Sequence, residues 1–120
     1  MTSYISHFNS DVGLVRKANE DYFQVVSSSE INNNGDLFIV CDGMGGHVGG
    51  RIASQLATES IVGFFESMFH ENPILALDKA IMHAHNQILT KSQSNPELKG
   101  MGTTCVVALY RDDDLYIGHV

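Results

Sequence analysis

Two successive stripes of apolar residues at helical spacing occupy the middle of the chain. The first stripe falls at i, i+3 and i+4 positions and comprises Ala53, Leu56, Ala57, Ile61, Phe64, Phe65 and Met68. Asn72 and Pro73 then predict a new helix start, because asparagine caps a helix and proline suits its first turn. The second stripe comprises Ile74, Leu77, Ile81, Ala84 and Ile88. This spacing predicts two amphipathic helices, the first beginning near Ile52.

Strand patterns flank the two helices on both sides. Before them, 21–29 is rich in aromatic and β-branched residues, and 36–42 is apolar without alternation, which predicts a central strand covered on both faces. The segment "INNNG" between them predicts a turn. After the helices we expect a loop over 91–100, strands over 103–110 and 115–120, and a hairpin turn at "RDDD". A weak alternation over 3–10 is compatible with an edge strand.

Composition limits the classes of protein to which the chain can belong. Its 120 residues allow one domain at most, and 43% hydrophobic residues suit a globular core. The net charge of -7 disfavours a nucleic-acid or anionic-membrane partner. Neither a secretory signal nor a long apolar run is present, which predicts a cytoplasmic location. Cys41 and Cys105 lie inside apolar runs and are expected to be buried, reduced thiols.

The segment "IVCDGMGGHVGG" places a carboxylate at the tip of a predicted buried strand. Asp42 would be unfavourable there unless it is paired or binds a cation, and hard divalent cations favour carboxylate and carbonyl oxygens. A role in capping the next helix is the alternative, but the apolar stripe starts too far along the chain. Nucleotide binding is disfavoured, because Val48 interrupts the glycine pattern and no Gly-Lys-Ser/Thr sequence follows.

The segment "RKANED" gathers charged residues ahead of the first strand. Glu20 and Asp21 are adjacent, so in a strand they would face opposite ways and serve different partners. Arg16 has a planar guanidinium group that can donate two hydrogen bonds to the oxygens of one phosphate group. On spacing alone, however, a surface salt bridge between Arg16 and Glu20 is the favoured interpretation.

Four segments together resemble a known enzyme family. The segments "SDVGLVRKANEDYF", "LFIVCDGMGGHVGG", "MGTTCVVALY" and "LYIGHV" resemble, in this order, the opening motifs of the metal-dependent type 2C protein serine/threonine phosphatases, in their bacterial branch. The resemblance implies an α+β fold, in which a layered antiparallel β-sandwich is flanked by helices. It also implies that residues 1–120 form a partial phosphatase 2C-like domain, the first half of that fold.

The resemblance further assigns roles to site residues. Asp42 matches the aspartate that bridges two Mn²⁺ or Mg²⁺ ions, and Gly43 would offer its carbonyl oxygen to one ion. Glu20 and Asp21 match acids that help to hold the metals, largely through water, and Arg16 matches the arginine that binds the substrate phosphate. Water activated between the metals would then hydrolyse phosphoserine or phosphothreonine in proteins. The implied partners are phosphorylated proteins, with a serine/threonine kinase as a second candidate, and neither nucleic acid nor membrane.

Two departures from the family pattern leave alternatives open. Met44 stands where many relatives carry a histidine, so the acid for the leaving group is unassigned. The chain also stops at Val120, before the family's later metal-binding aspartates, which predicts a fragment that is inactive on its own. A truncated, non-catalytic module that binds phosphoproteins or a partner is the alternative, and a small nucleotide-binding module is a distant third. A reading frame that continues past Val120 would favour the phosphatase fragment, and a stop codon the non-catalytic module.

Overall fold

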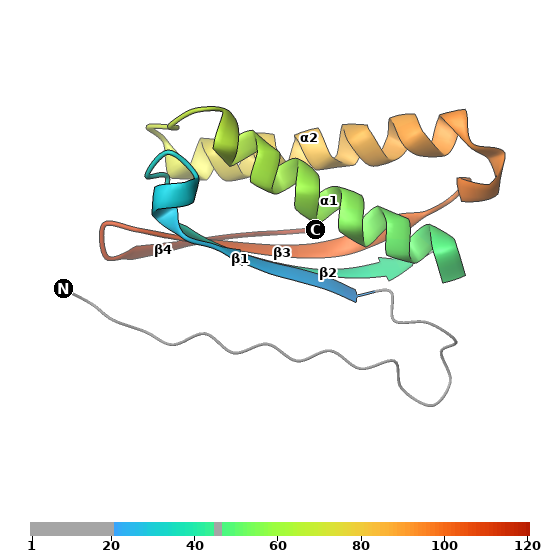
Figure 1. Cartoon of the computed structure of the whole chain (residues 1–120), viewed down its shortest axis with the longest axis horizontal. Coiled ribbons are helices and arrows are strands. Elements are labelled where there is room, and N and C mark those ends of the chain that lie inside the picture. Colours follow the sequence, from blue (N-terminus) through green and yellow to red (C-terminus); the bar gives the residue numbers. More distant parts are fainter. Residues whose placement is uncertain (1–20, 45–46) are drawn as a thin grey trace.

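The computed structural model describes residues 21–44 and 47–120, which form a layer of helices on one face of a β-sheet (Figure 1). The strands are β1 (Asp21–Val26), β2 (Asp36–Met44), β3 (Gly102–Arg111) and β4 (Asp114–His119). The helices are α1 (His47–Ser67) and α2 (Pro73–Ser94), with short 3-10 turns at Ser28–Glu30 and Pro96–Leu98. The predicted edge strand over 3–10 lies outside the described residues. The α+β class is confirmed.

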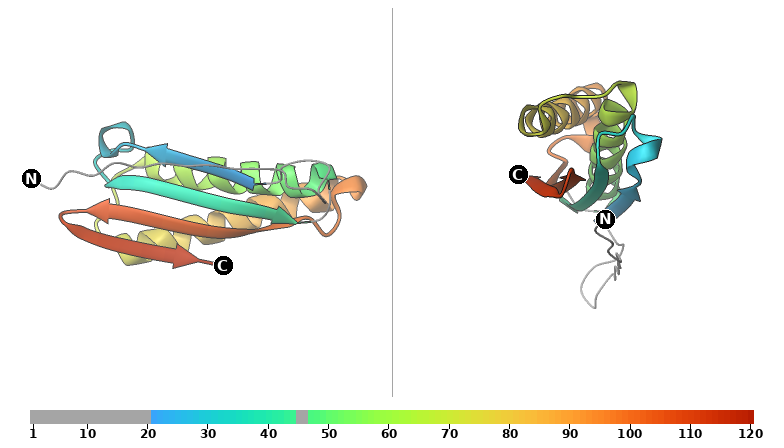
Figure 2. Two further views of the ribbon diagram at one scale, coloured as in Figure 1. Left: turned by 90° about the horizontal axis from the view of Figure 1, so that it is seen from below. Right: turned by 90° about the vertical axis from the view of Figure 1, so that its left-hand side faces the viewer.

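The four strands form one antiparallel sheet in the order β1-β2-β3-β4 among the described residues. Figure 2 shows this order from the face that neither helix covers. Asp112 and Asp113 connect β3 to β4 with φ values of 53° and 66°, which is the left-handed backbone of a two-residue hairpin turn. The predicted hairpin at "RDDD" is therefore confirmed.

The core lies between the sheet and the two helices. It contains the helix-facing residues of the central strands and the inner faces of α1 and α2; its largest fully buried side chains include Phe65, Ile31, Leu37, Ile39, Ile61 and Leu109. Asn72 caps α2 as predicted, because its Oδ1 accepts a hydrogen bond from the Leu75 N–H at 3.1 Å. The prediction of which α2 residues face the core is only partly correct. Ile74 is exposed, whereas Ala76 and Ala80, which the predicted stripe did not include, are buried.

Three boundary predictions were wrong. Helix α1 begins at His47 and not near Ile52, because glycines 49 and 50 continue the helix before its apolar stripe starts. The predicted loop over 91–100 is helical as far as Ser94 and then forms the turn Pro96–Leu98. The first strand ends at Val26, and the 3-10 turn Ser28–Glu30 replaces its predicted end.

The prediction that β2 is covered on both faces was also wrong for the part of the chain that the structure describes. Burial alternates along β2: Leu37, Ile39 and Cys41 face the helices, whereas Val40 is 47% exposed on the other face. Apolar residues on the neighbouring strands share this open face, because cross-strand partners project the same way. We call it the open sheet face; its exposed members are Phe23, Val25, Val40, Val106, Leu115 and Ile117.

We expect the 120-residue chain to self-associate through the open sheet face, because contiguous exposed apolar surface favours association. Replacing the register partners Val40 and Val106 together by threonine keeps β-branched side chains and adds hydroxyl groups to this face. The double variant should show a lower apparent mass in light scattering than the wild type. Ile74→Thr, on an exposed position of α2, is the control and should leave the mass unchanged. A monodisperse monomeric wild type at every concentration would contradict the prediction.

Candidate active site

Asp42 lies near the end of β2 and projects from the open sheet face. Strand alternation places its neighbours Cys41 and Gly43 on the buried, helix-facing side and leaves Asp42 exposed. Asp21, the first residue of β1, is its direct cross-strand partner and is half-buried. The sheet therefore brings together two of the predicted metal-binding carboxylates, which lie 21 positions apart in the sequence.

The hydrogen-bonding pattern of the sheet shows how close this pair is. Cys105 exchanges both of its main-chain hydrogen bonds with Val120, at 3.1 and 3.0 Å, so its main chain points away from β2. Main-chain direction alternates along a strand, so Asp42 points its main-chain groups toward β3 and not toward β1. Asp21 and Asp42 therefore form a non-hydrogen-bonded pair, in which Cα atoms lie about 4.5 Å apart and side chains are closest.

The same alternation directs the main chain of Gly43 toward the β1 side of the sheet. Its carbonyl group therefore points to the strand that carries Asp21, as a main-chain ligand near the two carboxylates would require. On the other side of Asp42, Thr104 is its partner on β3, and the Thr104 hydroxyl donates to the Asp42 carbonyl oxygen at 3.4 Å. Sequence reasoning missed Thr104, which only the β2–β3 register places here.

The donors assembled at this point are oxygens. Two carboxylates and a backbone carbonyl suit Mg²⁺ or Mn²⁺, whereas softer metals favour thiolate or imidazole ligands. Within residues 21–44 and 47–120, no group of three or more histidine, cysteine or acidic side chains could hold a metal ion. Arg16 and Glu20 lie outside the described residues. The described part of the chain thus supplies a pair of acids, and a complete site needs further ligands.

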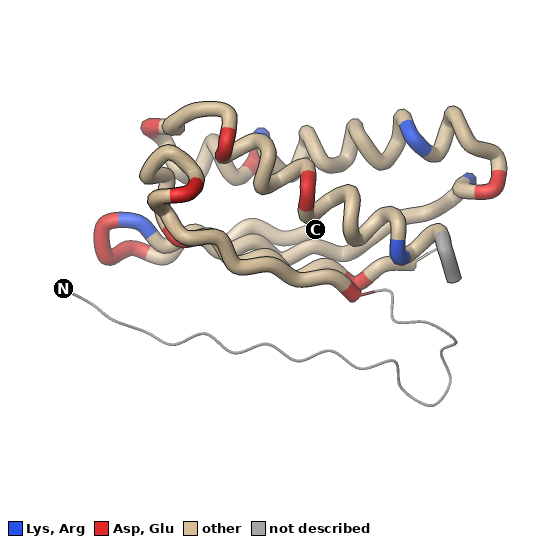
Figure 3. The backbone as a smooth tube through the Cα atoms, in the orientation of Figure 1, with Lys and Arg blue, Asp and Glu red and all other residues tan. Residues whose placement is uncertain are grey.

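Acidic residues are not confined to the neighbourhood of this pair. Figure 3 shows acidic positions spread over turns and helices of the described chain. The two thiols lie on the opposite side of the sheet from Asp42 and are buried and free, as predicted. A hydrogen bond with Cys41, followed by desolvation, raises the pKa of the Cys105 thiol well above its ordinary value. Neither described helix is long and apolar enough to cross a membrane.

Comparisons with known proteins support one family. The profile of the protein phosphatase 2C family matches residues 15–120. The serine/threonine protein phosphatase PstP of Mycobacterium tuberculosis is 32% identical over 111 residues, which cover 92% of this chain and 20% of PstP. A crystal structure of a bacterial serine phosphatase superposes with a TM-score of 0.82 at 34% identity, covering 95% of this chain and 46% of the other.

A second solved structure bears on the metal. The catalytic domain of PstP in complex with 2 manganese ions superposes with a TM-score of 0.66 at 30% identity. The match covers 91% of this chain and 52% of that domain. The chain therefore spans about a fifth of PstP and about half of the solved phosphatase chains.

Proposed function

The chain belongs to the protein phosphatase 2C family, and we propose that it supplies one half of the active site of a metal-dependent protein serine/threonine phosphatase. The observation that carries the proposal is the pairing of Asp21 and Asp42 on adjacent strands. This pairing gathers hard oxygen donors at the point where the family resemblance expects a metal centre. The presence of 2 manganese ions in the related catalytic domain of PstP supports Mn²⁺ or Mg²⁺ as the cation.

In this proposal carboxylates and one backbone carbonyl would hold the cations. Asp42 would be the carboxylate shared by both cations, the Gly43 carbonyl oxygen would be a ligand of one of them, and Glu20 and Asp21 would help to hold them, largely through water. Arg16 orients the substrate by a bidentate contact to its phosphate group. When bound, the cations would supply an activated water for attack on phosphorus and would neutralise charge on the phosphoryl oxygens.

We assign the activity to a complete domain of which residues 1–120 are a part. The described residues provide two acids at the site, and few shared oxygens predict weak metal affinity and little or no turnover for this chain alone. Phosphorylated proteins are the proposed substrates in the cytoplasm, with a serine/threonine kinase as a further proposed partner. The open sheet face favours a second candidate, a non-catalytic module that binds a phosphoprotein or another partner.

Metal-dependent hydrolysis of p-nitrophenyl phosphate by the full product of the gene tests the proposal. We expect turnover with Mn²⁺ or Mg²⁺ and essentially none with excess chelator, because the acids alone cannot activate water. The 120-residue chain, assayed in parallel, should show little or no activity. Restored activity after Mn²⁺ is added back excludes simple denaturation by the chelator. Undiminished activity in excess chelator would overturn the mechanism, and a folded but inactive full product would favour the non-catalytic module.

A further inference from the structure

On the helix-facing side of the sheet, β2 and β3 place the only two cysteines of the chain opposite each other. Cys41 and Cys105 are register partners, and their Sγ atoms lie 3.4 Å apart. Both side chains are buried, and neither forms a disulfide bond. The neighbouring Asp42 projects from the other face of the sheet, so the thiol pair is separate from the candidate active site.

The main-chain geometry suits a covalent link between the two cysteines. Cys105 directs both of its main-chain hydrogen bonds to Val120, so the pair with Cys41 is of the non-hydrogen-bonded type. Such pairs have a Cα separation of about 4.5 Å. This value lies within the range of about 4.4 to 6.8 Å that disulfides span. The Cα separation therefore permits a disulfide, for which the two sulfurs must approach from 3.4 Å to about 2 Å.

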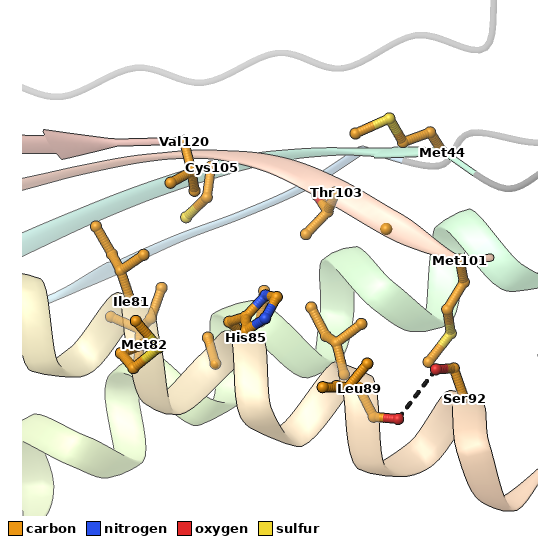
Figure 4. A pocket seen from close by; sticks show the side chains of 15 residues that line it. Met44, Ile81, Met82, His85, Leu89, Ser92, Met101, Thr103, Cys105 and Val120 are labelled. Carbon is orange, nitrogen blue, oxygen red and sulfur yellow. Dashed lines mark hydrogen bonds between the residues drawn. The ribbon is translucent and has the colours of Figure 1, made fainter. Parts of the chain in front are cut away.

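The two thiols differ in how a small reagent can reach them. Cys105 lines a cavity of about 460 Å³ between α2 and the β3–β4 edge, and Figure 4 shows its side chain directed from the sheet toward α2. Cys41 lies deeper, fully buried beneath α1, with the Thr58 hydroxyl 3.5 Å from its sulfur. A reagent that enters the cavity therefore meets Cys105 first.

We propose that Cys41 and Cys105 form a modification site at which a peroxide-class oxidant converts the two thiols into an intramolecular disulfide. Hydrogen peroxide transfers one oxygen to one of the two sulfurs, which becomes a sulfenic acid as one water leaves. The sulfur of the other cysteine then attacks the oxidised sulfur, the S–O bond breaks, and a second water carries away the oxygen. The two sulfurs together lose two electrons to the peroxide, and both thiol hydrogens end in water.

The bond would have a measurable physical consequence. It would join the central strands across 64 positions of the sequence, which restricts the unfolded chain much more than the folded one. The oxidised chain should therefore unfold at a higher temperature than the reduced chain. Phosphatase activity does not enter this measurement, so the disulfide and the proposed function can fail independently.

The experiment treats the folded 120-residue chain with hydrogen peroxide and analyses it by intact mass spectrometry and non-reducing peptide mapping. We expect a monomer lighter by about two mass units, with peptides of Cys41 and Cys105 linked and the unlinked form restored by a reductant. The unfolding midpoint Tm of the oxidised monomer should be higher by at least about 5 °C.

Cys41→Ala and Cys105→Ala are the matched controls, and neither should give a linked monomer or the rise in Tm. Three results would overturn the proposal: both thiols survive peroxide in the folded chain, the link forms only in urea, or oxidation lowers Tm. If an alanine variant does not fold, the peptide map of the wild type still shows whether Cys41 and Cys105 are linked. An intramolecular disulfide can join only these two residues, because the chain has no third cysteine.

Discussion

Replacing Asp42 by asparagine is expected to lower metal-dependent phosphatase activity of the full gene product by at least about a hundredfold. The substitution keeps the shape of the side chain and removes its negative charge, so each cation loses a charged ligand. Asp42 projects from the open sheet face and is not part of the core, so the fold should persist. Activity in saturating Mn²⁺ is the primary measurement.

A second measurement separates loss of metal binding from loss of folding. Mn²⁺ should raise the Tm of the wild type, because a cation that binds only the folded state stabilises it. This rise should be absent or much smaller in the Asp42→Asn variant. Without metal, the variant should be at least as stable as the wild type, because carboxylates directly opposite each other repel.

Asp112→Asn is the matched control for the Asp42 experiment. It makes the same change of charge in the exposed β3–β4 turn, where φ is 53° and asparagine adopts that backbone readily. Its activity and its response to Mn²⁺ should match those of the wild type. Equal losses in both variants, or an Asp42→Asn variant with full activity, would remove Asp42 from the proposed site.

The sequence points to Asp42 as a candidate metal ligand but cannot place it beside Asp21. An acid at the tip of an apolar strand is a local feature, which the sequence alone displays. Its pairing with Asp21 depends on the register between two strands, which no local pattern determines. The same limit explains why Thr104 was missed.

The wrong prediction for β2 has a different physical origin. An apolar run without alternation resembles a strand buried on both faces. In the described structure the helices cover only the side of Leu37 and Ile39, and Val40 is exposed on the other side. Hydrophobicity indicates which face of a strand can be buried, but it does not show whether the described residues include a layer that covers that face.

The segment "INNNG" forms a turn, as predicted, but its side chains also make tertiary contacts that the sequence pattern does not reveal. Asn32 and Asn33 have φ values of 57° and 60°, as the predicted turn requires. The side chains of this segment also cap the end of α1: the Asn32 Nδ2 donates to the carbonyl oxygens of Phe65 and Glu66 at 3.1 and 2.7 Å. A helix leaves its last carbonyl groups without helical partners, and these contacts satisfy two of them. Only the tertiary structure brings residues more than 30 positions apart into this arrangement.

Asn34 is the centre of this cap and is fully buried. Its Nδ2 donates to three carbonyl oxygens, those of Ile31, Phe65 and Met68, at 2.8 to 2.9 Å. Its Oδ1 accepts from the His70 N–H at 2.8 Å, which fixes the orientation of the amide. The side chain thus links the β1–β2 turn, the end of α1 and the connection to α2.

Asn34→Asp should therefore lower the free energy of unfolding at neutral pH by about 3 to 5 kcal/mol. The change replaces a donor by a carboxylate oxygen that faces three carbonyl oxygens, of which those of Phe65 and Met68 lie at the negative end of the α1 dipole. Burial and these carbonyls favour the protonated form of the new carboxyl, whereas the Arg111 guanidinium, 3.4 Å from Oδ1, favours its charged form. Because the three carbonyl oxygens lie closer, at 2.8 to 2.9 Å, we expect a raised pKa in the folded state, and the loss should shrink as the pH falls and the group is protonated. Urea unfolding followed by circular dichroism at neutral and acidic pH measures both effects. Asn33→Asp makes the same change one residue earlier at an exposed position and should alter the stability by less than about 0.5 kcal/mol. Equal stabilities of the two variants would show that the Asn34 amide contributes little to holding α1 against the sheet.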